Sequence, residues 1–445
     1  MNELPVVVVG AGPIGLAAAA ELAGREVPVL VVERGAHAGA AVTQWQHVRL
    51  FSRWAELVTP AAARLLEPRG WSHPDPDGYP TGHDWFEHYL RPLADALGER
   101  VRLDSEVVGV ARRGRDRVVD AGREVEPLTV HVRTADGMEY RLAARAVIDA
   151  SGTWTSPNPL GGDGLPAIGE HAAAQQISYR VPDLADPAVA ARYVDKHVVV
   201  AGSGHSALTA LAGLAALAAE HPSTRITWLL RRGEAGSVFG GGDADELPAR
   251  GALGLRARAA VQDGNVRVVN GFRTEAVNHT EDGRMALVPT VGDPITEVDE
   301  VVVSTGFRPD LSWLSEIRLG LDSTLQAPVA LAPLIDPNMH SCGTVYPHGV
   351  KELSHPEPGV FVAGMKSYGR APTFLAMTGY EQVRSIAAFL AGDHEAAERV
   401  ELRLPETGVC GGSGLFDVPA EDSAGGCCAT PAAVQDLTLS PTPVR

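Results

Sequence analysis

The chain has 445 residues and a mass of 46.8 kDa, a length that favours two or three domains over one compact module. Hydrophobic residues make up 45% of it and charged residues 21%, which is enough apolar material for a sizeable core. Lys and Arg number 38 against 55 Asp and Glu, so the formal net charge is −17, and neither nucleic acid nor a membrane is expected as a partner. Four cysteines are too few for a disulfide framework, and we expect a soluble, cytoplasmic protein.

The N-terminal residues predict a strand, a tight turn, a helix and a second strand. Val6–Val9 is typical of a strand buried on both faces of a parallel sheet. It is followed by Gly10-Ala-Gly12-Pro13-Ile14-Gly15, a helix-forming run over 16–23 and a second strand that ends at Glu33. The first glycine permits the turn, the second lets the backbone approach a pyrophosphate, and the third lets helix and strand pack closely. Glu33 is then placed to accept hydrogen bonds from an adenosine ribose.

A second copy of this pattern begins at Val198. It contains Gly202-Ser203-Gly204-His205-Ser206-Ala207, where alanine replaces the third glycine, and a strand over 226–230 that runs into Arg231 and Arg232. Two guanidiniums at a strand end suit a 2′-phosphate, so they indicate NADPH, although a solvated strand end would carry the same residues. Two sites with opposite charges at their strand ends favour FAD at the first and NADPH at the second, with hydride passing from one to the other.

The rest of the chain predicts an α/β protein. We expect a helix from about 84 to 97, a buried strand over 301–303, a late strand over 360–363 and a helix from about 373 to 391. The predicted division is a first part of an FAD-binding domain over 1–160, an NADPH-binding domain over 190–312, a second part of the FAD-binding domain over 313–398, and a flexible Cys-containing tail over 399–445.

Several stretches resemble the flavin-containing monooxygenase superfamily, in its bacterial branch and plant-type relatives, over about residues 4–395. They are Trp45-x-x-Val-Arg49-Leu-Phe-Ser, Tyr79-Pro-Thr81, Asp149-Ala-Ser151-Gly152-Thr-Trp-Thr-Ser-Pro157 and Ser304-Thr305-Gly306-Phe-Arg-Pro-Asp310. The resemblance implies two Rossmann-like dinucleotide-binding domains, with the NADPH domain inserted into the FAD domain. It also places Val107 near the FAD adenine, Gly152 and Thr305-Gly306 at the two crossings between domains, and Gly364 beside the flavin ribityl chain.

The residues expected to bind the cofactors come from the two glycine motifs with their strand ends and from the family resemblance. Those for FAD are Gly10, Gly12, Pro13, Ile14, Gly15, Glu33, Arg34, Trp45, Arg49, Val107, Ser151, Gly152 and Gly364, and those for NADPH are Gly202, Ser203, Gly204, His205, Ser206, Arg231 and Arg232, with Thr305 and Gly306 at the return crossing. The activity implied is an NADPH-oxidising monooxygenase that acts through a C4a-peroxyflavin on nitrogen, sulfur or trivalent arsenic in a small-molecule substrate. The second substrate implied is O₂. The oligomeric state is left open, with a homodimer as one option.

The sequence departs from the superfamily in one place. Where a histidine is expected after the crossover, the chain has Ile177-Ser178-Tyr179, and His171 lies out of register. This weakens the case for standard oxygenase chemistry. Disulfide reductases share the architecture, but they need a Cys-x-x-Cys or Cys-x4-Cys pair beside the flavin, and the sequence contains neither spacing.

The thiols and the residues near the expected flavin leave alternatives open. Lys366, Tyr368 and Cys342 are the catalytic candidates; Lys366 or Arg370 would stabilise reduced flavin or would be surface cations, and the loop around Cys342 would face substrate or merely pack. The tail cysteines Cys410, Cys427 and Cys428 could bind a metalloid such as trivalent arsenic, in keeping with a resemblance to flavoproteins of arsenic resistance, or could be incidental. An NADPH-dependent reductase that uses the C-terminal Cys pair, or a metalloid-binding flavoprotein, are the alternative functions.

Overall fold

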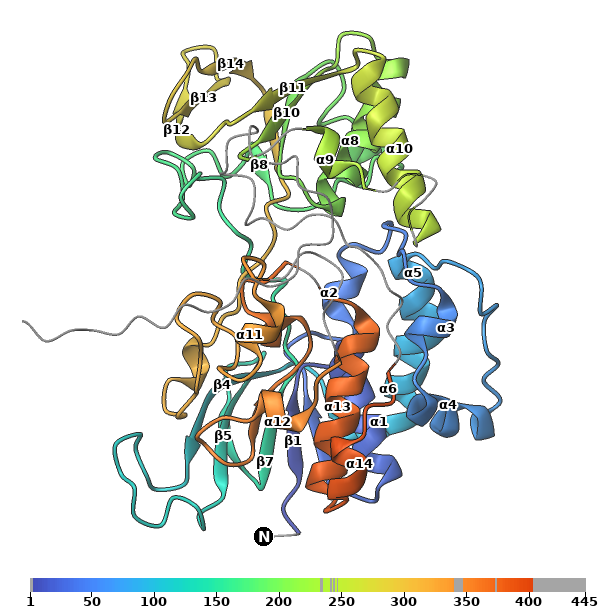
Figure 1. The fold of residues 1–445 in the computed structure, drawn as a ribbon, viewed down its shortest axis with the longest axis vertical. Coiled ribbons are helices and arrows are strands. Elements are labelled where there is room, and N and C mark those ends of the chain that lie inside the picture. The colour runs from blue at the N-terminus through green and yellow to red at the C-terminus, as the bar shows by residue number, and fades with distance from the viewer. Residues whose placement is uncertain are drawn as a thin grey trace, which may run out of the picture.

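The structure is a computed structural model, and it describes residues 3–232, 235–240, 242, 245, 247–339, 347–372 and 374–402. Two sheets of five strands each form the centres of two lobes, which lie one above the other in Figure 1. We call the part built on the first sheet the first lobe and the part built on the second sheet the second lobe. All strand pairs within both sheets are parallel, which confirms the predicted α/β class.

The first sheet contains the valine run at the N-terminus of the chain. Its strand order is β16 (Val360–Val362), β7 (Ala146–Asp149), β1 (Val6–Val9), β2 (Val29–Val32) and β3 (Val101–Arg102). Every residue of β1, β2 and β7 is buried, as a sheet covered on both faces requires. In register, Val9 lies between Val32 and Asp149, so these three residues mark the carboxyl edge of the sheet.

The second sheet comes from a stretch of chain that lies entirely between β7 and β16. Its order is β11 (Val266–Asn270), β10 (Arg225–Leu230), β9 (His197–Ala201), β15 (Glu300–Val303) and β8 (Ile177–Ser178). The second lobe is therefore an insertion in the sequence of the first, as predicted, whereas the numerical domain bounds given above stay a prediction.

Helices cover both sheets. α1 (Pro13–Gly24) and α13 (Ala376–Leu390) pack together in the first lobe, and α8 (His205–Glu220) packs with α10 (Pro248–Gln262) in the second (Figure 1). The helix predicted over 84–97 is present as α5 (Gly82–Trp85), a π turn (Phe86–Leu90) and α6 (Arg91–Leu97). In the described part of the chain, no helix combines the length and apolar character that a bilayer crossing requires.

The remaining elements are short helices and two antiparallel meanders. The α-helices are α2 (Ala40–Thr43), α3 (Trp54–Leu57), α4 (Pro60–Leu66), α7 (Pro187–Ala190), α9 (Ala235–Val238), α11 (Ala332–Ile335), α12 (Val350–Leu353) and α14 (His394–Glu398). The meanders are β4 (Ser105–Arg112), β5 (Leu128–Thr134) and β6 (Glu139–Ala144) in the first lobe, and β12 (Thr274–His279), β13 (Met285–Pro289) and β14 (Ile295–Val298) in the second.

Two chain segments connect the lobes, and they run side by side. Pro157 and Phe307 form an antiparallel bridge, the Asn158 N–H donates to the Gly306 carbonyl over 2.9 Å, and the Arg308 N–H donates to the Ser156 carbonyl over 2.8 Å. The chain thus leaves the first lobe and returns to it at neighbouring points.

Candidate functional site

The first glycine turn has the geometry that a pyrophosphate requires. Gly10 has a φ of +98°, and a Cβ there would lie 2.9 Å from the Ala150 carbonyl oxygen. A Cβ on Gly15 would lie 1.9 Å from the Gly10 carbonyl oxygen, so the start of α1 packs directly on the turn. A Cβ on Gly12 would meet nothing within 4 Å. The middle glycine therefore exposes backbone at the positive end of α1, where an anion is stabilised.

Glu33 is held in place by the same turn. Its two carboxylate oxygens accept hydrogen bonds from the backbone N–H groups of Ala11 and Gly35, each over 2.7 Å. Each oxygen keeps a further lone pair for a ligand hydroxyl. The Ser105 N–H donates to the Glu33 carbonyl over 2.8 Å, which brings the start of β4 and the buried Val107 close to this end of β2. Arg34 is exposed.

The second glycine turn repeats the first with one change. Gly202 has a φ of +131°, and its Cβ would lie 2.2 Å from the Ser304 carbonyl oxygen, whereas a Cβ on Gly204 would meet nothing within 4 Å. Ala207 is fully buried where the first turn has Gly15. Ser203, Gly204 and Ser206 are exposed at the start of α8. This helix start is also open to a phosphate.

Arg231 and Arg232 do not occupy the position in the second lobe that corresponds to Glu33. Arg231 lies one residue after that position. Val9 is opposite Val32 and Ala201 is opposite Leu229, so the position of Glu33 is occupied in the second lobe by the fully buried Leu230. Arg231 is exposed and donates to the Gly162 carbonyl over 3.2 Å, and Arg232 follows it. Both arginines thus follow the last residue of β10.

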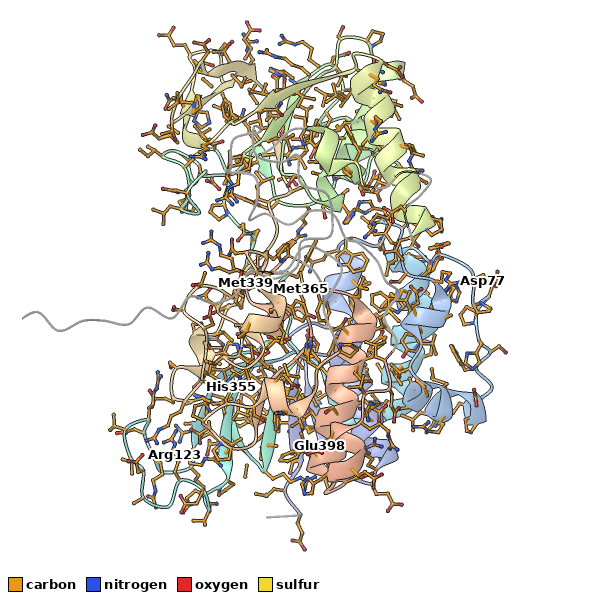
Figure 2. All side chains as sticks on the ribbon, in the orientation of Figure 1. Asp77, Arg123, Met339, His355, Met365 and Glu398 are labelled. Carbon is orange, nitrogen blue, oxygen red and sulfur yellow. The ribbon has the colours of Figure 1, made fainter. Side chains whose placement is uncertain are left out.

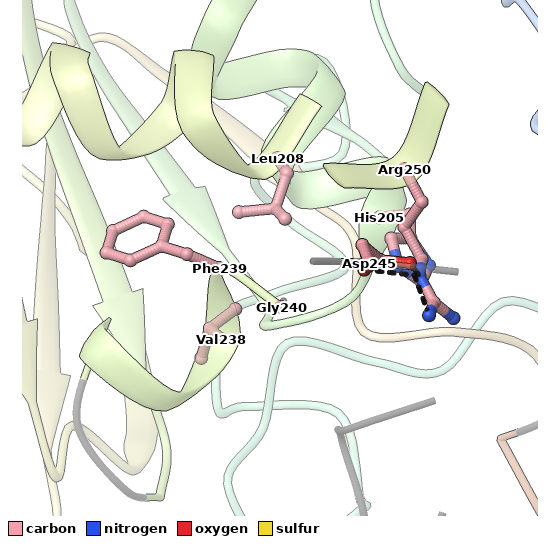
Figure 3. Close-up of a pocket in the computed structure, with 7 residues that line it drawn as sticks. All are labelled: His205, Leu208, Val238, Phe239, Gly240, Asp245 and Arg250. Carbon is pink, nitrogen blue, oxygen red and sulfur yellow. Dashed lines mark hydrogen bonds and ion pairs between the residues drawn. The ribbon is translucent and has the colours of Figure 1, made fainter. Parts of the chain in front are cut away.

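The ring of His205 is packed between the lobes. It lies edge-on to Phe51 of the first lobe with 5.0 Å between ring centroids. On its other side is a hollow of about 10 Å³, lined also by Phe239 and by the buried ion pair of Arg250 and Asp245 at 2.7 Å (Figure 3). Burial and the Arg250 charge lower the pKa of His205, so its imidazole is neutral near pH 7. The hollow is the size of one water molecule and is too small for a substrate.

Lys366 is part of a buried charged cluster at the carboxyl edge of the first sheet. Its Nζ lies 2.7 Å from Asp149 Oδ2 and 3.0 Å from Ser151 Oγ, and 5.1 Å from the centre of the Trp313 ring. The side chains of Lys366 and Asp149 are 1% and 0% exposed. The neighbouring Met365 is seen near the level where the lobes meet (Figure 2). The surface-cation alternative is therefore wrong for Lys366. Asp149 and Trp313 were not predicted as site residues, although a charged residue at the end of an apolar strand was a signal for Asp149.

Gly364 lies against the start of α1. A Cβ on Gly364 would lie 3.1 Å from Ile14, and the Gly364 N–H donates to Gln382 Oε1 over 2.7 Å. The next residues of the same 3-10 turn include Tyr368, which is buried against the rings of His348 and Phe374. Burial raises the pKa of Tyr368 and keeps its phenol protonated.

The remaining predicted cofactor residues lie in the first lobe and at the connections between the lobes. Trp45 packs on Trp85 at a centroid distance of 6.4 Å, and Arg49 donates to the Tyr79 carbonyl. Ser151 Oγ donates to Asp149 Oδ1 over 2.6 Å, and Gly152 follows it with a φ of +68°. Thr305 Oγ1 donates to the Asn158 carbonyl over 3.1 Å, directly before Gly306 at the return crossing. The structure thus brings Ser151 to the same edge as the Gly10 turn and Thr305 to the crossings, whereas Trp45 and Arg49 contact Trp85 and Tyr79.

The structure describes the position where a histidine was expected, but it does not describe the four cysteines. Ile177 is a buried residue of β8 paired with Val301, whereas His171 is exposed, so the position where a histidine was expected is part of the core. Cys342, Cys410, Cys427 and Cys428 all lie outside the described residues. Within the described ranges, no group of three or more His, Cys, Asp and Glu side chains is arranged to hold a metal ion.

Comparison with known proteins gives a family match. A family model described as pyridine nucleotide-disulphide oxidoreductase matches residues 7–333. Among curated proteins, the indole-3-pyruvate monooxygenase YUCCA1 of Oryza sativa subsp. japonica is 34% identical over 142 residues. That match covers 31% of this chain and 33% of the rice protein, so the chain spans about a third of the length of that relative.

Solved structures of similar fold include reductases and monooxygenases. The bacillithiol disulfide reductase Bdr (YpdA) of Bacillus cereus has a TM-score of 0.64 and 19% identity, covering 87% of this chain and 99% of its own. The flavin-containing monooxygenase of Stenotrophomonas maltophilia has a TM-score of 0.55 and 20% identity, with 88% and 99% covered. The ornithine hydroxylase PvdA of Pseudomonas aeruginosa has a TM-score of 0.56 and 18% identity, with the same coverage. The predicted resemblance to flavin-containing monooxygenases is confirmed.

Proposed function

Because this chain belongs to the pyridine nucleotide-disulphide oxidoreductase family and is an oxidoreductase that uses a flavin and a nicotinamide nucleotide, we propose that it is an FAD-dependent, NADPH-oxidising monooxygenase. The observation that carries the proposal is the pair of open glycine turns, one at the carboxyl edge of each parallel sheet. In sheets of this kind, ligands bind outside the carboxyl ends of the strands. Two turns in two lobes suit two dinucleotides that exchange a hydride.

The first turn fits FAD. Its open Gly12 and the start of α1 suit a pyrophosphate, and Glu33 offers carboxylate oxygens to a ribose. Gly364 and Ile14, which contact each other at the start of α1, would then flank the ribityl chain. When bound, the flavin supplies the redox chemistry, and the chain's own part is to bind it, to orient it and to exclude water.

The second turn fits NADPH. Its helix start is open at Gly204, and Arg231 and Arg232 supply positive charge beyond the end of the neighbouring strand. Guanidinium groups bind phosphate through paired N–H donors, so this charge favours the nucleotide that carries a 2′-phosphate. NADH lacks that group.

We prefer oxygenation to disulfide reduction because of how the cysteines are spaced in the sequence. The four cysteines of the sequence form neither of the pairs that a flavin-linked disulfide reductase needs. The proposed overall reaction moves two electrons from NADPH through the flavin to O₂, with one oxygen atom passing to a soft nucleophile (nitrogen, sulfur or trivalent arsenic) and the other leaving as water. Cys410, Cys427 and Cys428 remain candidates for binding the arsenical.

Stopped-flow spectroscopy tests the proposal. The flavin-loaded protein is reduced by NADPH without oxygen and then mixed with oxygenated buffer, and we expect the transient absorbance of a flavin–oxygen adduct before oxidised flavin returns. Direct return to oxidised flavin, together with thiol-dependent NADPH oxidation that is lost on replacing Cys427 and Cys428 by Ser, would instead favour the reductase. Failure of NADPH to reduce the flavin would contradict the assignment of the second turn.

A further inference from the structure

A cleft of about 440 Å³ lies between the two lobes, and its lining contains no residue of either glycine turn. One wall is the segment 43–47 of the first lobe, and the other is the segment 178–193 of the second. The first wall follows directly from the FAD turn, because the Gly39 N–H at the start of α2 donates to the Ala11 carbonyl over 2.8 Å. The volume lies in the range of small-molecule sites in proteins.

The second wall is mainly apolar, and its charged residues are Arg180, Asp183 and Arg192. The apolar residues are Val181, Pro182, Ala188, Val189 and Tyr193. The Arg180 guanidinium lies over the Trp154 ring, 5.3 Å from its centroid. Trp154 is fixed in turn, because its Nε1–H donates to Gln44 Oε1 over 2.9 Å and its ring packs on Phe307 at 5.1 Å. The aromatic face therefore orients the guanidinium before any ligand arrives.

The other arginine of the cleft is already paired, and the lining also contains one carboxylate, Asp183. Arg192 donates to Glu300 over 2.6 Å and to the Gln175 carbonyl over 2.8 Å, and Asp183 lies 3.9 Å from His47. The Arg180 guanidinium, in contrast, makes no hydrogen bond or ion pair with any residue in the described ranges. The cleft thus combines an apolar wall with one arginine that is oriented by an aromatic ring and keeps its N–H donors for a ligand.

We propose that this cleft binds a small carboxylate with an apolar body, whose carboxylate pairs with Arg180 and whose body lies against Val181, Pro182 and Val189. A planar guanidinium matches a carboxylate through two parallel N–H donors. The ligand is named a substrate only on the basis of the proposed function, since the first wall begins at the proposed flavin site. NADPH is a different anion with its own site at Gly204.

Calorimetric titration of the flavin-loaded protein tests this inference with 3-phenylpropionate and its neutral isostere 3-phenylpropionamide. We expect the carboxylate to bind at least tenfold more tightly than the amide, and Arg180→Gln to abolish that difference. Arg180→Lys should restore only part of it, because an ammonium keeps the charge but loses the fork. Ala188→Trp, which fills the cleft from α7, should weaken both ligands. Arg225→Gln is the matched control, because Arg225 is an exposed arginine at the far end of β10. It should change the affinity for neither the carboxylate nor the amide.

Two results would overturn the inference: equal binding of carboxylate and amide by the parent protein, or a preference for carboxylate that persists in Arg180→Gln. NADPH reduction of the flavin in the parent protein is measured on the same preparation. If reduction fails while Arg180-dependent binding persists, the proposed function is wrong and the carboxylate site stands. If reduction proceeds and no carboxylate binds, only the cleft proposal is wrong.

Discussion

The two lobes place the same turn at the same edge of the same kind of sheet, yet the residues around the two turns differ in charge. In both, the first glycine abuts a carbonyl oxygen of the neighbouring strand's extension, and the second glycine faces open space. Around the first turn, however, the strand ends carry Asp149 and Glu33, whereas the matching positions of the second lobe carry Val303 and Leu230. If the two turns bind dinucleotides as proposed, the shared backbone geometry sets where each pyrophosphate binds, and the flanking side chains select the nucleotide.

The largest expected effect is a loss of stability when Asp149, at the end of β7, is replaced by valine, the residue at the matching position of the second lobe. Asp149→Val copies Val303 and leaves Lys366 buried without its carboxylate. We expect a loss of about 3 to 5 kcal/mol in the free energy of unfolding, measured by urea unfolding of the flavin-free protein. The double variant Asp149→Val/Lys366→Met should recover most of this loss. If the single variant is as stable as the parent, the ion pair is not the reason for the difference between the lobes.

The next effect concerns the third glycine. Gly15→Ala places a Cβ 1.9 Å from the Gly10 carbonyl oxygen, and moving α1 away from the turn should cost about 3 kcal/mol, or about 100-fold in flavin affinity. Flavin affinity is measured by fluorescence titration of the flavin-free protein with FAD. Ala207 shows that the second turn accommodates the same methyl group. Gly24→Ala, whose Cβ would meet nothing within 4 Å at the end of the same helix, is the control and should bind flavin normally.

A third effect tests the charges beyond β10. Replacing Arg231 and Arg232 by Ala should raise the KM for NADPH about 30-fold, equivalent to about 2 kcal/mol, while the KM for NADH changes little, because only NADPH carries the 2′-phosphate. Steady-state NADPH and NADH oxidation measure both values. Arg225→Ala, at the opposite end of the same strand, should leave them unchanged. Equal losses with both nucleotides would refute the NADPH assignment.

The smallest expected effect is a difference between the two lobes in how their stability depends on pH. Burial lowers the pKa of His355, in the first lobe, to about 4 (Figure 2). Because the folded pKa lies below the unfolded one of about 6.5, the stability that His355 contributes is present above pH 6.5 and is lost as the pH falls towards 4. From pH 7.5 to 5.0, we expect flavin release by urea to become easier by about 1 to 2 kcal/mol in the parent and by less in His355→Gln.

The control for this titration is His197 in the second lobe. Burial also lowers its pKa, and its ring contacts Thr227 Oγ1 at 2.9 Å. His197→Gln should leave the pH dependence of flavin release as in the parent, because this histidine lies in the other lobe. The same pH dependence in parent and His355→Gln would show that other groups carry the acid response.

Sequence reasoning predicts the local units well and the long-range contacts poorly. Val6–Val9 and the two glycine turns are recognisable because a buried parallel strand and a tight turn each need particular residue types within a few positions. The one-residue offset between Glu33 and Arg231 was not predictable, because strand ends depend on pairing with neighbours. The contact of Lys366 with Asp149 likewise needs the order of strands, which no local pattern contains.

The cleft beside Arg180 was missed for a related reason. Its walls come from two connecting segments, 43–47 and 178–193, whose residues have no periodicity and acquire a common role only when the lobes meet. Arg180 stands three residues after Ile177, and no local pattern marks it as part of a site. The burial of Ile177 in β8 shows that this position serves the core.

The paired connections at Pro157 and Phe307 give the second lobe an unusual genetic independence. Since the chain enters and leaves that lobe at hydrogen-bonded neighbours, residues 159–305 form a cassette whose two ends are already joined in space. Removing or exchanging this cassette displaces no strand of the first sheet, because all five of its strands lie outside it. Recombination between related genes at these two points would therefore transfer the whole proposed nicotinamide-nucleotide module, while the proposed flavin-binding lobe keeps its own connectivity.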